Sequence, residues 1–220
     1  MTSIGKVSRR AFVGGSAAAG GGLALGFTVL FPTASAQSTA PATEINIWVA
    51  IKPDDTCVIR IARSEMGQGT ITGLAQLVAE ELECDWKKVA LEQITPGRNL
   101  ASKRAWGEMG TGGSRGIRTS QDYVRRGGAA ARMMLLQAAA DAWKVPVAEL
   151  TVADGIITHK ASNRSTSYGK VAGAAAKLTP PDPKSITLKD PKDWKIARQA
   201  DETARHGRDS STVANSLRST

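Results

Sequence analysis

Hydrophobic and polar residues alternate in two segments between residues 44 and 62, which predicts two β-strands. The segments 44–51 (EINIWVAI) and 56–62 (TCVIRIA) both alternate, and a period of two is typical of half-buried strands. The polar run 52–55 (KPDD) between them has the composition of a turn. The two strands are therefore predicted to form a hairpin.

The pattern then changes to a helical period. In 70–83 apolar residues recur at spacings of three and four, which predicts one buried helical face. This face comprises Ile71, Leu74, Ala75, Val78 and Leu82. A second helix is predicted over 119–143, with a seam of mostly small residues that lets another backbone approach closely. The seam comprises Val124, Gly128, Ala131, Leu135, Ala138 and Ala142.

The other segments are short. Asp154-Gly155 lies between two apolar runs and predicts a hairpin. The remaining predictions are strands at 89–94, 150–153 and 156–159, a Gly-rich loop at 95–116, a helix at 168–178 and a Pro-rich stretch at 180–193. Strand and helix patterns mix without a regular βαβ rhythm, which favours the α+β class: a hairpin and short mixed strands packed with two main amphipathic helices.

The first 36 residues resemble an export signal. Arg9 and Arg10 directly precede an uncharged run, 11–31, and the small residues Ala34 and Ala36 provide a cleavage site. The arginine pair is typical of a twin-arginine signal, which carries folded proteins, often after cofactor insertion. The run is long enough for a membrane anchor, but its six glycines favour a cleaved signal. We therefore expect a periplasmic or otherwise exported protein that uses the export machinery.

Composition limits the other function classes. The chain has 220 residues and a net charge of +9. An excess of positive charge is typical of proteins that bind nucleic acid or an anionic membrane. The basic residues are scattered and aromatic residues are few, so we expect a solvated basic surface and no nucleic-acid binding. With two cysteines, Cys57 and Cys84, and two histidines, no zinc, iron–sulfur or other metal site is expected. Whether the two thiols pair in an oxidising compartment is left open.

The first of two Gly-rich segments is Ser64–Gly69 (SEMGQG), between a predicted strand and a predicted helix. Its glycines let a backbone approach a ligand, and the helix start offers N–H groups to an anion. Gln68 both donates and accepts hydrogen bonds, which suits a heterocycle edge. The alternative is a tight turn without a ligand, ordered by Glu65.

The second segment is Gly110–Gly116 (GTGGSRG), whose amides, hydroxyls and Arg115 would form an anion nest. Arg115 stands where a dinucleotide fingerprint needs its third glycine, and no phosphate-binding Gly-Lys-Ser/Thr loop occurs. No nucleophilic triad is recognisable either, so no catalytic residue is assigned. The flanking Glu108 is interpreted as ordering a turn.

Together these segments resemble the molybdopterin-binding large subunit of the xanthine oxidase and aldehyde oxidase family. The resemblance lies in 65–69 (EMGQG), in the helix ending 79–82 (AEEL), in the strand ending 93–96 (QITP), and in the Gly-Gly-Ser loop at 112–114. The twin-arginine start is most similar to the isoquinoline 1-oxidoreductase beta-subunit branch. The similarity covers about 44–194, which would be the N-terminal part of a molybdopterin-binding domain after a 37–43 linker.

The resemblance implies a molybdenum cofactor, expected as the cytosine dinucleotide form of molybdopterin. By position, Gly67, Gln68 and Gly69 would contact its dithiolene and phosphate region. The nucleotide or phosphate end would be held by Gly112, Gly113, Ser114 and Arg115. The family oxidises aldehydes or N-heterocycles with oxygen from water, and passes electrons to a small iron–sulfur subunit and, in exported members, to a cytochrome. The alternative is a non-catalytic exported binding or assembly module of the same fold.

The end of the chain departs from the family pattern. The family's catalytic glutamate lies far beyond this region and nothing here matches its motif, so this chain alone is expected to be an inactive N-terminal fragment. Residues 195–220 are predicted to be a disordered tail. One permitted coding of 198–205, read one base later, gives the family-like Gly-Lys-Pro-Met-Lys-Arg-Leu. A frameshift near Arg198 and a natural tail are the two hypotheses.

Overall fold

The structure is a computed structural model that describes residues 41–198. The chain divides into two units, Met1–Gln37 and Ser38–Thr220, and all described residues belong to the second. The predicted signal with its arginine pair and cleavage site lies outside the described residues, as do most of the predicted linker, residues 199–220 and the frameshift hypothesis.

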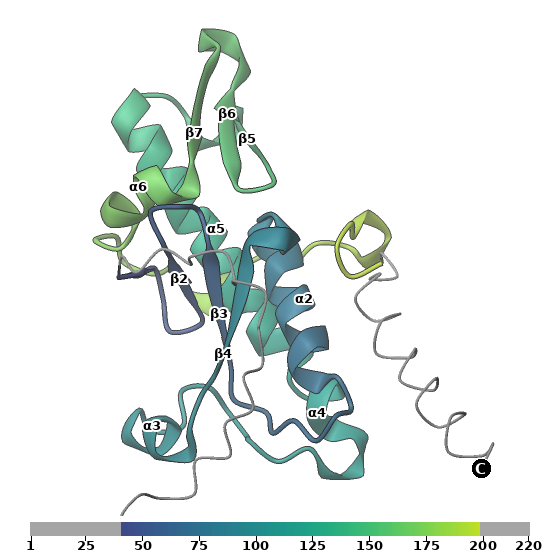
Figure 1. Cartoon of the computed structure of the whole chain (residues 1–220). Helices are drawn as coiled ribbons and strands as arrows, with labels where there is room; N and C mark the ends of the chain where they lie inside the picture. Colours follow the sequence, from purple (N-terminus) through teal and green to yellow (C-terminus); the bar gives the residue numbers. More distant parts are fainter. Residues whose placement is uncertain (1–40, 199–220) are drawn as a thin grey trace, which may run out of the picture. The chain divides into compact units, whose positions relative to one another are not determined.

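A four-stranded sheet forms the centre of the described part (Figure 1). Its strands are β1 (Thr43–Glu44), β2 (Val49–Ile51), β3 (Cys57–Ile61) and β4 (Val89–Gln93), in that order across the sheet. The first two pairings are antiparallel, and β3 pairs with β4 in parallel. The predicted hairpin of two strands around 52–55 is therefore confirmed as β2 and β3.

The single strand predicted over 44–51 is wrong, because a turn divides it into β1 and β2. The side-chain oxygen of Asn46 accepts hydrogen bonds from the backbone N–H groups of Trp48 (2.9 Å) and Val49 (3.0 Å). An asparagine that bonds its own backbone two residues on favours a turn over a strand. The alternation of apolar residues hid this local competition.

Two helices pack side by side and against the sheet (Figure 1). They are α2 (Thr70–Leu82) and α5 (Gln121–Trp143). At Gly128, an added Cβ would lie 2.4 Å from the backbone oxygen of Val78, so only glycine permits this helix contact. The predicted seam is buried except for Ala142. The 23-residue α5 is longer than the 13-residue α2, so its last turn extends past its partner.

The predicted loop 95–116 contains two short helical segments and the start of a third. These are α3 (Pro96–Ala101), the 3-10 turn η2 (Gly112–Ser114) and α4 (Arg115–Arg118). The hydroxyl of Thr95 accepts from the N–H of Arg98 (3.3 Å), and Pro96 occupies the first helical position. A threonine N-cap followed by proline is a helix start, which the glycine-rich composition obscured.

A second, three-stranded antiparallel sheet follows α5. It contains β5 (Leu150–Ala153), β6 (Ile156–His159) and β7 (Arg164–Ser167). The hairpin predicted at Asp154-Gly155 is confirmed, since Ala153 pairs with Ile156. The polar strand β7 carried no apolar alternation and was not predicted. It leads into α6 (Tyr168–Ala175), and the hydroxyl of Tyr168 donates to the backbone oxygen of Leu82 (2.6 Å).

The last described residues are anchored to α2 by the buried carboxylate of Glu80. Glu80, which is 2% exposed, accepts backbone N–H bonds from Lys195 (2.8 Å), Ile196 (2.6 Å) and Ala197 (3.1 Å). Its fully buried neighbour Glu81 accepts from Arg125 (2.9 Å). Residues 195–197, which the sequence placed in the tail, are therefore docked on the fold. Short 3-10 turns at Trp86–Lys88, Val147–Glu149, Lys160–Ser162, Pro183–Ser185 and Pro191–Asp193 complete the elements.

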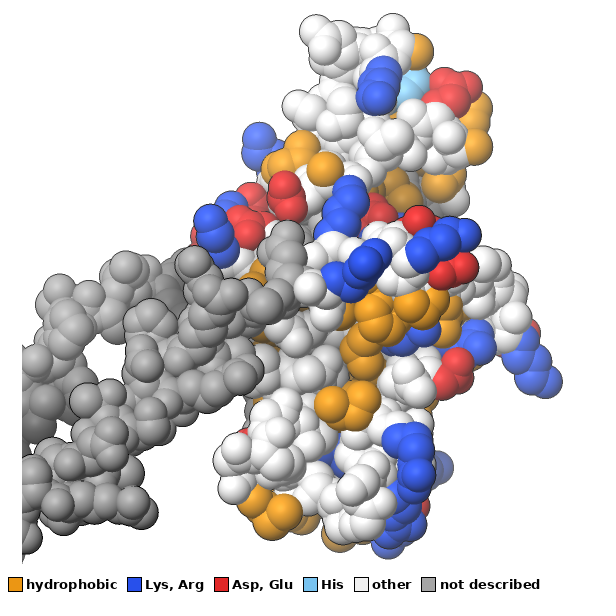
Figure 2. Space-filling view, turned by 90° about the vertical axis from the view of Figure 1, so that its right-hand side faces the viewer, with side chains coloured by type: hydrophobic (Ala, Val, Ile, Leu, Met, Phe, Trp, Pro, Cys, Tyr) orange, Lys and Arg blue, Asp and Glu red, His pale blue; other side chains and the backbone are white. Residues whose placement is uncertain are grey.

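The surface has no single basic patch on the face seen in Figure 2, where Lys and Arg side chains are interspersed with acidic and hydrophobic ones. Between residues 41 and 198, no helix is both long and apolar enough to cross a membrane. In the same part of the chain, no group of three or more His, Cys, Asp and Glu side chains could hold a metal ion.

Candidate functional site

The first glycine-rich loop connects β3 to α2 and is closed by its own glutamate. One carboxylate oxygen of Glu65 accepts from the N–H groups of Gly67 (2.8 Å) and Gly69 (2.9 Å), and the other accepts from Ile71 (3.0 Å). These hydrogen bonds lower the pKa of Glu65, and the bond from Ile71 has the largest effect. A charged acceptor at a helix start is also favoured by the helix dipole. Glu65 therefore orders this turn, as the sequence suggested.

This arrangement corrects part of the expectation that the start of α2 offers free N–H groups to a ligand. The carboxylate of Glu65 already accepts from the N–H of Ile71 in the first turn and from that of Gly69 directly before the helix. What the loop presents is its exposed outer face, Met66–Gly69. Gly67 and Gly69 have φ values of +93° and +78°, and an added Cβ at either would meet nothing within 4 Å. The backbone is therefore open to close approach from outside.

Gln68 is folded back onto the loop. Its amide nitrogen donates to the backbone oxygen of Ser64 and to the hydroxyl of Thr70, both at 3.0 Å, and its oxygen accepts from the N–H of Met66 (2.7 Å). The amide stabilises the loop in this structure, so a ligand contact through its side chain would require it to exchange one of these partners.

The second loop lies beside the first because two glycines permit it. An added Cβ at Gly116 would lie 2.9 Å from a side-chain carbon of Thr70, and one at Gly73 would lie 2.9 Å from Ile117. The start of α4 therefore packs closely on the start of α2, as Figure 1 shows. Both glycine-rich loops are held at the same end of α2.

Arg63 ties the second loop to β3 from inside. Its guanidinium, only 2% exposed, donates to the hydroxyls of Ser120 (2.8 Å) and Thr119 (2.7 Å) and to the backbone oxygen of Gly110, and lies 3.4 Å from a carboxylate oxygen of Glu108. A buried charge is tolerated when it is paired and hydrogen-bonded. No sequence motif marks this residue as part of the site. Its only signal was a basic residue directly after an apolar strand.

Four predicted residues of the second loop, Gly112, Gly113, Ser114 and Arg115, are all exposed. Gly113 and Ser114 have positive φ values of +66° and +55°, and the guanidinium Nε of Arg115 lies 3.4 Å from the backbone oxygen of Gly112. Beside them is a cavity of about 430 Å³, bordered by Arg104, Gly110 and Arg115 and by the apolar Pro96, Leu100 and Met109, together with Asn99, Gly107 and Glu108. Cationic and apolar walls suit an anionic ligand with a flat ring.

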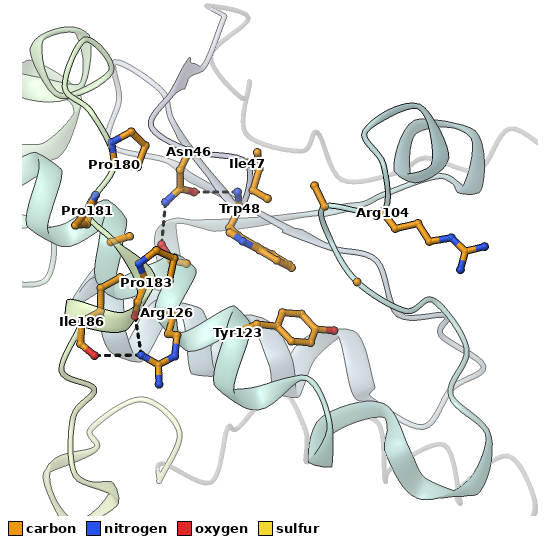
Figure 3. A pocket seen from close by; sticks show the side chains of 14 residues that line it. Asn46, Ile47, Trp48, Arg104, Tyr123, Arg126, Pro180, Pro181, Pro183 and Ile186 are labelled. Carbon is orange, nitrogen blue, oxygen red and sulfur yellow. Dashed lines mark hydrogen bonds between the residues drawn. The ribbon is translucent and has the colours of Figure 1, made fainter.

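A larger cavity of about 500 Å³ lies between the β1–β2 turn, α5 and the Pro-rich stretch, and it shares Arg104 and Gly107 with the smaller one (Figure 3). None of the seven predicted cofactor-binding residues borders it. Arg126 closes one side by donating to the backbone oxygens of Pro183 (2.8 Å) and Ile186 (3.2 Å), whereas Arg104 points away from the other labelled residues. We place the candidate site on the exposed faces of the two glycine-rich loops and at the smaller cavity, which Gly110 and Arg115 of the second loop border together with Arg104.

Comparisons with known proteins show the family of the chain. The family model of the molybdopterin cofactor-binding domain matches residues 7–217. The chain is 35% identical over 143 residues to the isoquinoline 1-oxidoreductase subunit beta of Brevundimonas diminuta, covering 64% of this chain and 18% of that protein. It is 32% identical over 171 residues to the membrane-bound aldehyde dehydrogenase [pyrroloquinoline-quinone] of Gluconacetobacter polyoxogenes, covering 75% of this chain and 21% of that one.

Among solved structures, quinoline 2-oxidoreductase from Pseudomonas putida 86 is similar with a TM-score of 0.44 and 22% identity, over 57% of this chain and 15% of that one. A CO dehydrogenase from Oligotropha carboxidovorans gives a TM-score of 0.44 and 23% identity over the same shares. The chain spans about a fifth of the length of the curated relatives it matches.

Proposed function

The chain belongs to the molybdopterin cofactor-binding domain family, within the xanthine oxidase family and with the expected α+β fold, and we propose that it forms the cofactor shell of an exported molybdenum hydroxylase. The observation that carries this proposal is the placement of both glycine-rich loops at one end of α2, with Arg63 bonded to Gly110, Thr119 and Ser120. Both loops are thereby held in fixed positions relative to α2. A cofactor that contacts both loops needs such a fixed arrangement.

The exposed loop residues fit a large anionic cofactor. Gly67, Gly69, Gly112 and Gly113 have open space where a side chain would be, so a ligand meets backbone directly. Arg104 and Arg115 border the adjoining cavity and supply positive charge to phosphate groups. The first loop offers fewer amides than expected, because Glu65 accepts from three of them.

We assign the predicted residues accordingly. Gly67, Gln68 and Gly69 would hold the dithiolene and phosphate region, and the 112–115 segment, ending in Arg115, would hold the nucleotide or phosphate end of a cytosine dinucleotide form. When bound, the molybdenum centre supplies the redox chemistry. The residues of this chain bind and orient the cofactor, and none of them is assigned a proton transfer.

Activity and partners are proposed for the whole protein. The names of the two relatives, an isoquinoline oxidoreductase subunit and an aldehyde dehydrogenase, support an N-heterocycle or an aldehyde as substrate. Electrons would leave through a small iron–sulfur subunit to a cytochrome acceptor. We also propose export by the twin-arginine route, supported by Arg9 and Arg10 before the uncharged run. The double substitution R9K/R10K should leave the protein in the cytoplasm, and normal periplasmic recovery of that variant would contradict this route.

The cofactor proposal is tested by loading. The full chain, expressed in a host that makes the cofactor, should retain molybdenum and about one oxidisable, fluorescent pterin per chain, measured by metal mass spectrometry and fluorescence. R115A should lower both, whereas R164A, which removes an exposed arginine on β7, should not. A protein that carries no pterin in any form supports the alternative of an assembly module. A bound quinone in place of pterin would point to the cofactor named for the second relative.

A further inference from the structure

The two cysteines of this chain meet in its core. Cys57 is the first residue of β3, and Cys84 follows the end of α2. Both belong to the same hydrophobic cluster and are 1% and 2% exposed. These are the only cysteines among 220 residues, and the segment between them is long enough to have placed them far apart.

Both cysteines lie beside the start of α6. An added Cβ at Gly155 would lie 3.6 Å from the ring of Tyr168 and 4.0 Å from the Cα of Cys84. The N–H of Gly169 donates to the side chain of Asp55, two residues before Cys57 (2.8 Å). A hydrogen bond with the thiol of Cys57, together with burial, raises the pKa of Cys84. Tyr168 lies next to the pair: burial first, and then the neighbouring Cys84, Glu83 and Cys57, raise the pKa of its hydroxyl. The start of β3, the end of α2 and the start of α6 therefore come together at the two cysteines.

The backbone around Cys84 is firmly held. The hydroxyl of Tyr168 donates to the backbone oxygen of Leu82 (2.6 Å), and the N–H of Gly155 donates to that of Glu83 (2.8 Å). On the other side, Cys57 is paired with Ile51 in the antiparallel ladder and with Val89 in the parallel one. The contact between the thiols is thus set by two rigid elements.

We propose that Cys57 and Cys84 are a redox modification site, and that a disulfide oxidant such as oxidised glutathione converts them to a disulfide bond. The two thiols lose two protons and two electrons as the S–S bond forms. The S–S bond of glutathione breaks and takes them up, which yields two reduced glutathione molecules. The reaction is a pair of thiol–disulfide exchanges through a mixed disulfide.

The bond would join β3 to the end of α2, the two elements that flank the first glycine-rich loop. The covalent link would restrict the unfolded chain and so stabilise the folded one. Because both thiols are buried, an oxidant reaches them only when the core opens. Oxidation is therefore expected to be fast during refolding and slow in the folded protein, and a formed bond should resist reductant under native conditions.

The test uses the full chain, unfolded with reductant and refolded in a glutathione redox buffer. Iodoacetamide is then added in denaturant and the mass is measured. We expect a chain that is lighter by two hydrogens and carries no alkyl group. Its melting temperature should be roughly 10 °C above that of the reduced chain. Two alkylated thiols after refolding, or a lower melting temperature for the oxidised form, would overturn the proposal.

Three variants serve as controls. C57S and C84S each keep one buried thiol, so the remaining cysteine should be recovered as a free thiol and their melting temperatures should not respond to reductant. The double variant C57A/C84A shows by circular dichroism whether the core folds without sulfur. If it folds and melts like the oxidised protein, the bond contributes nothing and the proposal fails. None of these measurements depends on cofactor binding.

Discussion

Replacing Arg63 by methionine should loosen the second loop while leaving the rest of the fold intact. Methionine keeps the apolar stem of the side chain and removes the guanidinium, so it leaves no buried unpaired charge. The lost bonds are those to Ser120, Thr119 and Gly110 and the contact with Glu108. All four of these partners belong to the segment that carries the second loop.

The expected cost follows from the exposure of each partner. Gly110, Thr119 and Glu108 are exposed and can bond water instead, so their loss costs little. Ser120 is fully buried, and a hydrogen bond from a charged donor contributes about 1.5–3 kcal/mol. With a smaller contribution from the exposed partners, we expect the free energy of unfolding of R63M to fall by about 2–4 kcal/mol.

Urea denaturation measures this cost, and amide hydrogen exchange shows where it falls. Exchange should accelerate over 108–120 and stay unchanged in the second half of α5. R63K should recover part of the stability, because one ammonium group replaces the charge but not the fork of donors. R164M, with an exposed side chain, should match the unsubstituted protein. A loss below about 1 kcal/mol, or faster exchange spread evenly over the chain, would refute the role of Arg63 as a tie between loop and sheet.

Three further substitutions test other contacts. The lowered pKa of Glu65 means that its ionised form stabilises the fold above the usual pKa of about 4.5; urea titrations should show E65Q less stable at pH 7, with the difference shrinking as the pH falls through the folded-state pKa. G128A should destabilise by about 1–3 kcal/mol or more, because its Cβ meets a backbone oxygen of α2; the control G173A, in open space on α6, should stabilise by roughly 0.5–1 kcal/mol, and equal melting temperatures would contradict this. E80Q should let a protease cut near residues 195–197 faster, since an amide replaces their shared acceptor; an unchanged digestion rate would count against that anchor.

Patterns of period two and 3.6 were enough to predict the main elements. They located α2, α5, the β2–β3 hairpin and the β5–β6 hairpin, because in each case a buried face determines which side chains are apolar. They failed where a polar side chain bonds the local backbone, as at Asn46 and Thr95. They also failed at β7, where pairing comes from the neighbouring strand and not from burial.

For the candidate site, the glycines were visible in the sequence but their support was not. Arg63 and Ser120 are 57 positions apart, and nothing local to either indicates that they touch. The opposite error occurred at the start of α2, where local rules predicted free amides. There, Glu65 reaches forward to Ile71, a contact that depends on the course of the whole loop.

The closure of the first loop by Glu65 has a consequence for how a cofactor would be taken up. A loop that supplies its own anion is already in shape before any ligand arrives. The entropy cost of ordering the loop is then met during folding and not at binding, so ordering of the loop should not slow the loading of a cofactor. The chain could therefore complete its folding before it binds the cofactor.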